Sequence, residues 1–306
     1  MSNSNSRLRA GIYVGAAVLI VGSTLYWARD KFDGLRNVFS PKYWHDRGTG
    51  EDLFDAKTAI FKRGSREYPD LLLTIDDGPH PASLPRILDT LKKYHVKATF
   101  FLVGKQVKAH PDLVRRILAE GHEIGNHTQD HQRLDKLTED QIRRELAECD
   151  ANIVKATGRE TKLMRPPGMR FNPTVLKVVK AMGYTCIDWN LAAKDFVPAD
   201  RTLLHPFPKP NPNLDPHLIA DRIIGRVKNG EIILLHDIPV TADALPEILQ
   251  RLTEKGYRFK SSSEMLAELP QHVLVTSNPP AAHTLLTAEK GGPSANPLKP
   301  HHAAAH

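Results

Sequence analysis

The sequence contains few cysteines and only a small excess of one charge. There are 2 cysteines among 306 residues, which excludes a disulfide-stapled small scaffold and a four-cysteine zinc site. Any metal ion would therefore need His, Asp or Glu ligands. Lys and Arg total 42 against 35 Asp and Glu, and this net charge of +7 is too small to indicate a nucleic-acid partner.

The two cysteines fall in different kinds of predicted element. Cys149 lies in a predicted helix and Cys186 in a predicted strand, so we expect buried free thiols; an extracytoplasmic location would also permit a bridge. The hydrophobic share of 41% is that of a globular chain, and the length allows one large domain or two small ones.

One long uncharged run stands near the amino terminus. Residues 10–28 contain no charged side chain, and 19 residues approach the roughly 20 that span a bilayer as a helix. We expect a transmembrane anchor over 10–28, preceded by a short basic terminus over 1–9. No small-x-small cleavage site is evident before Arg29. The flanking positive charges are nearly balanced, so they do not decide the orientation of the anchor.

Three zones follow the expected anchor. Residues 29–66 lack periodicity and are predicted to form a stalk. Residues 67–270 are predicted to form the folded domain. Residues 271–306 are rich in Pro, Ala, Ser and Gly and are predicted to be disordered. This tail holds 5 of the 15 histidines, which we interpret as solvated, with weak transition-metal binding as the alternative.

Strand-like and helix-like segments alternate through the folded domain. Strands are predicted over 71–75, 98–103, 123–126, 162–164, 185–190, 231–235 and 257–260. Helices are predicted over 83–94, 111–120, 138–157, 173–183, 216–228 and 242–255, with a capping box at Thr138 and Gln141. Seven such units predict an α/β fold, a distorted (β/α)7-type barrel with parallel strands. The spacing alone does not separate this barrel from an open doubly wound sheet.

Polar residues stand where the predicted strands end. Carboxyl ends of parallel strands meet on one face, so groups at these positions gather in one place. A helix cap or a solvated loop explains one such residue but not five segments together. The residues are Asp76 and Asp77, His127, Arg165, Asp195 and His236.

His127 and His131 are four residues apart and would share one face of a helical turn. Such a pair is a weak signal alone. With a carboxylate from another strand end it becomes a two-His, one-carboxylate set, which leaves positions open for water and substrate. Asp76 and Asp77 offer two adjacent carboxylates, so one can bind metal while the other accepts a proton.

Five short motifs in this order resemble the polysaccharide deacetylases, also called the NodB-homology domain or carbohydrate esterase family four. The resemblance covers residues 67–270. The motifs are TIDDGP at Thr74–Pro79, HTQDH at His127–His131, RPPG at Arg165–Gly168, DF at Asp195–Phe196 and LLHD at Leu234–Asp237.

The resemblance implies a role for each polar residue. It makes Asp77, His127 and His131 ligands of one divalent metal ion, usually zinc, with cobalt, nickel or manganese as alternatives. It makes Asp76 the general base and His236 the general acid. Arg165 would tether the base and Asp195 would orient the acid. The pocket for oxyanion and substrate would include a main-chain N–H at Gly168, with Phe196 and Leu234.

Several positions depart from the family pattern. Ile75 replaces a usual Phe, Gly168 a frequent Tyr, and Phe196 a common Trp. None of these changes removes a polar catalytic group. The proline-rich segment 197–216 is long and follows Asp195, so it forms either part of a substrate-groove rim or a stiff loop with no substrate role.

Two classes of function follow from these residues. The first is a metal-dependent hydrolase that removes N-acetyl groups from an acetamido-sugar polymer of the cell envelope. Peptidoglycan N-acetylglucosamine comes first, and poly-N-acetylglucosamine, chitin oligomers and O-acetylated xylan are alternatives. The second is a catalytically silent, anchored glycan-binding protein on the same fold. We expect a monomer whose domain lies outside the cytoplasm, because envelope polymers lie there.

Overall fold

The computed structural model describes residues 53–195 and 214–269. The expected anchor over 10–28, Phe196 and the tail over 271–306 lie outside the described residues. None of the helices within 53–195 and 214–269 is both long and apolar enough to cross a bilayer.

The core of the fold is one curled sheet, in which parallel pairing dominates. Along the sheet the order is β1-β2-β7-β6-β5-β4-β3-β9-β8, and β10 pairs with β3. Among the strands of the described residues, β1 and β2 are the one antiparallel pair. The strands are β1 (Phe54–Asp55), β2 (Ile60–Phe61), β3 (Asp70–Asp76), β4 (Thr99–Leu102), β5 (Glu123–Asn126), β6 (Leu163–Met164), β7 (Thr185–Ile187), β8 (Leu191–Ala192), β9 (Ile232–His236) and β10 (Arg258–Lys260).

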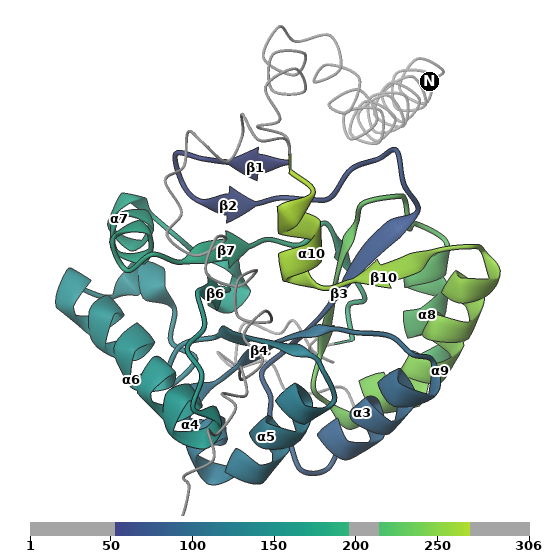
Figure 1. Ribbon diagram of the computed structural model, residues 1–306, viewed down its shortest axis with the longest axis horizontal. Helices are drawn as coiled ribbons and strands as arrows, with labels where there is room; N and C mark the ends of the chain where they lie inside the picture. Colours follow the sequence, from purple (N-terminus) through teal and green to yellow (C-terminus); the bar gives the residue numbers. More distant parts are fainter. Residues whose placement is uncertain (1–52, 196–213, 270–306) are drawn as a thin grey trace, which may run out of the picture.

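Helices surround much of the sheet. In Figure 1 the helices α6, α4, α5, α3, α9 and α8 form an arc on one side, and the β1–β2 hairpin and α10 lie on the other. The helices are α3 (Leu84–Lys93), α4 (Gly104–Ala109), α5 (Pro111–Ala119), α6 (Glu139–Thr157), α7 (Pro173–Ala181), α8 (Pro216–Ile224), α9 (Pro239–Glu254) and α10 (Ser262–Ala267). Two short 3-10 turns cover Leu134–Lys136 and Pro167–Met169.

Successive side chains along a strand alternate between the two faces of the curled sheet. One face packs under the helices, and the other lines the inner side of the sheet. In β9, Ile233 and Leu235 belong to the large cluster that packs under the helices. Ile232 belongs to a different, smaller cluster. Because successive side chains point to opposite faces, Leu234 and His236 share the inner face with Ile232. The same period puts Asp76 on the inner face of β3. Both strands therefore carry apolar residues for most of their length and a polar residue where they end.

The predicted barrel is only partly realised. Within the described residues the sheet is a curled half-barrel whose end strands, β1 and β8, do not pair with each other. The strand predicted over 185–190 is observed only as β7, which ends at Ile187 and lies between β2 and β6. Residues 188–190 then lead to β8, a strand that was not predicted and that lies beside β9 at the far end of the sheet.

The stalk predicted over 29–66 is wrong in its last part. β1 and β2 form a short hairpin, and β2 pairs in parallel with β7 through Ile60 and Cys186. Phe54 and Phe61 are buried in the sheet's inner cluster. These strands are two residues long, too short for alternation to reveal them. The capping box at Thr138 and Gln141 is confirmed, and both cysteines are buried and free.

Candidate active site

The predicted base, Asp76, and the predicted acid, His236, stand on neighbouring strands. In the parallel pair of β3 and β9, Asp76 and His236 are register partners. Neighbouring strands lie about 4.8 Å apart, so these two inward-facing side chains begin side by side. His127 and Arg165 each continue a ladder by one residue: the His127 N–H donates to the Leu102 carbonyl and the Arg165 N–H to the Asn126 carbonyl. The predicted gathering at the strand ends is therefore observed.

Arg165 is a fully buried cation that fixes Asp76. It is 1% exposed, and its Nη1 donates to Asp76 Oδ1 and to Thr74 Oγ1, each at 2.8 Å. Its Nε donates to the Ile187 carbonyl, and its guanidinium stacks over the Phe101 ring at 4.4 Å. A buried charge is tolerated only when it is paired and hydrogen-bonded, and Arg165 meets both conditions. One oxygen of Asp76 is thereby held, and the other points toward His127 Nε2, 3.8 Å away.

Three side chains converge as a candidate metal centre. Asp77 Oδ1 lies 3.3 Å from His127 Nε2 and 3.2 Å from His131 Nε2. One ligand atom from each residue falls within a cluster no wider than 4.8 Å. Burial raises the pKa of the Asp77 carboxyl, but the two facing imidazoles outweigh it and hold that pKa well below its usual value.

The chemistry of this donor set fits a divalent cation. His127 Nδ1 lies 2.7 Å from the Arg165 carbonyl, which can only accept, so the ring proton sits on Nδ1. Nε2 of the neutral ring then turns a lone pair toward Asp77 Oδ1, which is buried and has no hydrogen-bond partner. A carboxylate and a neutral imidazole that face each other can hold a divalent cation between them, and fixing the outer imidazole nitrogen is how proteins orient a metal-binding histidine.

The two histidines meet through a loop, which corrects the predicted helical turn. His127 follows β5 directly, and Thr128 and His131 adopt left-handed backbone with φ of 69° and 59°. Asn126 stabilises the first of these bends, because its Oδ1 accepts from the Thr128 N–H at 2.8 Å. Left-handed residues reverse the chain within a few residues, so the second imidazole returns to the first without helical spacing.

Glu145 braces the same loop from helix α6. Its Oε2 accepts from the Asp130 N–H at 2.9 Å and its Oε1 from Gln132 Nε2 at 3.0 Å. The side chain is buried at 8% exposure. Sequence reasoning missed this residue, because a Glu in a helix with many charged residues carries no signal until the loop that it faces is known.

The acid pair lies on the other side of β3. His236 Nδ1 is 2.8 Å from Asp195 Oδ1, and Asp195 Oδ2 accepts from the His236 N–H and from Thr241 Oγ1, each at 2.7 Å. Burial opposes protonation of His236, but the Asp195 carboxylate outweighs it and raises the pKa of the imidazole to about 9. Near neutral pH this side chain carries the proton that a general acid must donate. Thr241 was missed, since nothing in the sequence pairs it with Asp195.

The predicted pocket residues have different positions. Gly168 is exposed, with φ of 61° in the turn that follows β6. Leu234 is buried at 8% exposure, two residues before His236 on the inner face of β9, so it forms part of the floor beneath the acid. Phe196 lies outside the described residues.

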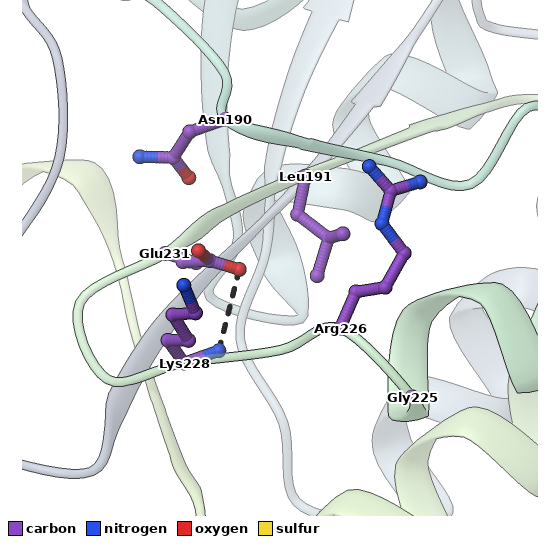
Figure 2. Close-up of a pocket in the computed structure, with 6 residues that line it drawn as sticks. All are labelled: Asn190, Leu191, Gly225, Arg226, Lys228 and Glu231. Atoms are coloured by element: carbon purple, nitrogen blue, oxygen red, sulfur yellow. Dashed lines mark hydrogen bonds between the residues drawn. The ribbon is translucent and has the colours of Figure 1, made fainter. Parts of the chain in front are cut away.

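A separate hollow of about 380 Å³ lies at the opposite edge of the sheet. Figure 2 shows its lining, in which Leu191 begins β8, Glu231 precedes β9, and Arg226 and Lys228 follow α8. The Lys228 N–H donates to Glu231 at 3.3 Å. None of the predicted site residues lines this hollow, so the candidate active site is the polar cluster at the carboxyl ends of the strands.

Comparison with known proteins agrees with this geometry. Residues 63–187 match the family model of polysaccharide deacetylases. A peptidoglycan-N-acetylglucosamine deacetylase of Bacillus cereus is 34% identical over 200 residues, which cover 64% of this chain and 87% of that protein. A peptidoglycan-N-acetylmuramic acid deacetylase of Bacillus subtilis is 35% identical over 225 residues, covering 73% and 81%.

The fold has the same relatives. The crystal structure of a CE4-family pseudoenzyme from Bacillus anthracis superimposes with a TM-score of 0.60 at 29% identity, covering 68% of this chain and 68% of that one. The curled α/β sheet, with carboxylate, imidazole and guanidinium side chains gathered at the strand ends, is the fold of this class of proteins. This chain belongs to the polysaccharide deacetylase family.

Proposed function

We propose that this protein is a metal-dependent deacetylase that removes N-acetyl groups from peptidoglycan N-acetylglucosamine. The observation that carries the proposal is the register of Asp76 against His236, with the Asp77, His127 and His131 cluster beside them. Base, acid and metal donors thus face one small volume. The similarity to proteins named as peptidoglycan deacetylases supports peptidoglycan as the polymer.

Each residue has a task in amide hydrolysis. Asp77, His127 and His131 would hold the divalent ion, zinc first, which polarises the acetyl carbonyl and acidifies water when bound. Asp76, held by Arg165 through Oδ1, accepts the proton of the attacking water at Oδ2. The main chain at Gly168 faces the developing oxyanion. His236 then gives its proton to the sugar nitrogen as the C–N bond breaks, and acetate and a free amine are the products.

A silent glycan-binding protein is the second candidate, and the pseudoenzyme among the structural relatives makes it a specific one. The described site argues against it. A binding module needs neither a base tethered by a buried arginine nor an imidazole whose pKa is raised to about 9.

A panel of polymers tests the proposal. The full chain is incubated with purified peptidoglycan, chitin oligomers, poly-N-acetylglucosamine and O-acetylated xylan, and released acetate is measured with and without a chelator. We expect the fastest release from peptidoglycan, lost with the chelator. Release from none of the polymers would favour the silent binding protein, and faster release from xylan would contradict N-acetyl specificity.

Location is part of the proposal. We infer a monomer that is anchored through residues 10–28, with its domain on the cell-wall side, because the substrate lies there. A compartment-sensitive reporter fused after residue 270 tests the orientation. A reporter signal from the cytoplasm would overturn it.

A further inference from the structure

Asp237 is a buried carboxylate that the proposed chemistry leaves without a task. It follows His236 directly and is completely buried. Both of its oxygens are occupied by one distant segment: Oδ1 accepts from Ser83 Oγ at 2.6 Å and Oδ2 accepts from the His80 N–H at 2.7 Å. Its own N–H donates to the Asp76 carbonyl at 2.9 Å. One residue therefore joins the end of β9 to the end of β3 and to the loop beyond it.

The loop that Asp237 holds is the one that presents Asp77. Asp77 has a left-handed backbone with φ of 74°, and residues 78–83 lead from it into helix α3. At Gly78 an added Cβ would lie 2.6 Å from Asp237 Oδ2, so the carboxylate occupies space that only glycine leaves open. The loop and the carboxylate are built against each other.

Ser83 makes a hydrogen bond to Asp237 in place of a local hydrogen bond to its own helix. It occupies the N-cap position of α3, where a serine hydroxyl normally accepts from the first turn of its own helix. Here the side chain makes no capping hydrogen bond and donates to Asp237 instead. The helix thereby forgoes the cap that a serine at this position commonly supplies. A contact retained at that cost indicates that the loop position matters.

We propose that Asp237 is a positioning residue that fixes the metal-binding Asp77 loop relative to the general acid His236. The inference rests on the proposed function for the roles of these two groups. The hydrogen bonds of Asp237 go to Asp76, His80 and Ser83, none of which is a predicted metal ligand. It acts through Asp76, His80 and Ser83, so its loss should loosen the Asp77 side of the cluster while His236 keeps its bond to Asp195.

Substitutions at Asp237 and Ser83 remove the hydrogen bonds of the two Asp237 carboxylate oxygens in different combinations. Asp237→Ala leaves the Ser83 hydroxyl and the His80 N–H buried without an acceptor. Asp237→Asn keeps one acceptor and turns an NH₂ group against the other donor. Ser83→Ala removes one donor and retains the bond to His80. Loss of groups that orient a metal ligand commonly costs about 10–100-fold in metal affinity. We expect that loss for both Asp237 variants, and a smaller one for Ser83→Ala.

A matched control is available on the same strand as Asp76. Asp70 is also a buried aspartate, 3% exposed, held by Arg258 and Lys260 at the opposite end of β3. Asp70→Asn should lower the melting temperature without changing zinc affinity. Comparison with it distinguishes loss of loop position from general loss of stability.

The experiment measures zinc affinity of the full chain by competition with a chelator, with melting temperatures of the same samples and the visible absorption of the cobalt-loaded protein. Weaker zinc binding and an altered cobalt spectrum in Asp237→Asn, Asp237→Ala and, less strongly, Ser83→Ala, but not in Asp70→Asn, support the inference. Wild-type zinc affinity in folded Asp237→Asn and Ser83→Ala overturns it and leaves the proposed function standing. Absence of zinc binding in the wild type overturns both.

Discussion

The two ends of strand β3 each carry a buried aspartate that is paired with a cationic side chain. The two ends differ in how far those cationic side chains are exposed to solvent. At the start of the strand Asp70 pairs with Arg258 and Lys260, whose side chains are 61% and 24% exposed. At the end of the strand Asp76 pairs with Arg165, which is 1% exposed. The first arrangement connects a strand end to the surface. The second keeps a full positive charge inside the fold.

This difference has a physical meaning. Taking an ion pair out of water costs more than the pair commonly returns, so a buried pair is weak evidence for stability. The Asp76 end adds Asp77, His127 and His236 to that cost, whereas the Asp70 end adds Glu231, which is 6% exposed and pairs with the partly exposed Arg66. A fold concentrates costly polar groups where chemistry needs them. The comparison therefore predicts that changes at one end alter turnover and changes at the other alter stability.

The largest effect should follow loss of a metal ligand. His127→Ala removes one of three donors and its link to the Arg165 carbonyl, so zinc affinity should fall by more than about 100-fold and activity to background. Elemental analysis after zinc loading checks this. Full zinc stoichiometry with full activity would remove His127 from the ligand set.

Loss of the acid should come next. His236→Ala should lower turnover by about 10²–10⁴-fold while zinc binding is retained, because the imidazole gives a proton and holds no metal. Turnover, zinc content and melting temperature are measured on the same sample. If turnover is retained, or falls only because the protein unfolds, His236 has a structural role instead.

A smaller effect is expected when His236 loses the carboxylate of Asp195. In the wild type, activity should decline on the alkaline side near pH 9, where His236 loses its proton. Asp195→Asn removes the carboxylate that raises this pKa and leaves the burial that lowers it. The alkaline limb of the pH–rate profile should therefore move to lower pH. An unchanged limb would dissociate Asp195 from proton donation.

The smallest effect on activity is expected at the other end of β3. Asp70→Asn should lower the free energy of unfolding by about 1–3 kcal/mol, because a buried charged acceptor loses its pairing with Arg258 and Lys260. Its neighbours lower the pKa of Asp70 against the opposing effect of burial, so this contribution should exist at neutral pH and disappear as the solution is acidified through that pKa. Denaturant titrations at pH 7 and in acid measure it. A large loss of turnover in the folded variant would break the contrast between the two ends.

The sequence predicted the parts of the fold that have local causes. Long runs with one period, such as β3 and α6, are found where apolar spacing and a capping box placed them. Two residues cannot show a period, and of the two-residue strands β1, β2, β6 and β8 only β6 lies within a predicted strand, the one over 162–164. The separation of β8 from β7 depends on pairing with β9, which no local pattern encodes.

In the candidate site, too, some features could be predicted from the sequence and others depend on contacts between distant segments. Residues at strand ends could be predicted, since parallel strands bring them to one edge whatever the loops do. The loop that joins His127 to His131 could not, because Glu145 of helix α6 holds it through Asp130 and Gln132. Asp237 stood in a quoted motif beside His236, yet its partners Ser83 and His80 are visible only in three dimensions.

The central claim is that one site uses a metal ion, held by Asp77, His127 and His131, for deacetylation. The most direct measurement is acetate release from peptidoglycan by the full chain as zinc is removed with a chelator and restored in steps, with bound zinc determined at each step. We expect the rate of acetate release to be proportional to bound zinc, with no release at zero occupancy and full recovery at one zinc ion per chain. An undiminished rate in zinc-free protein would contradict it.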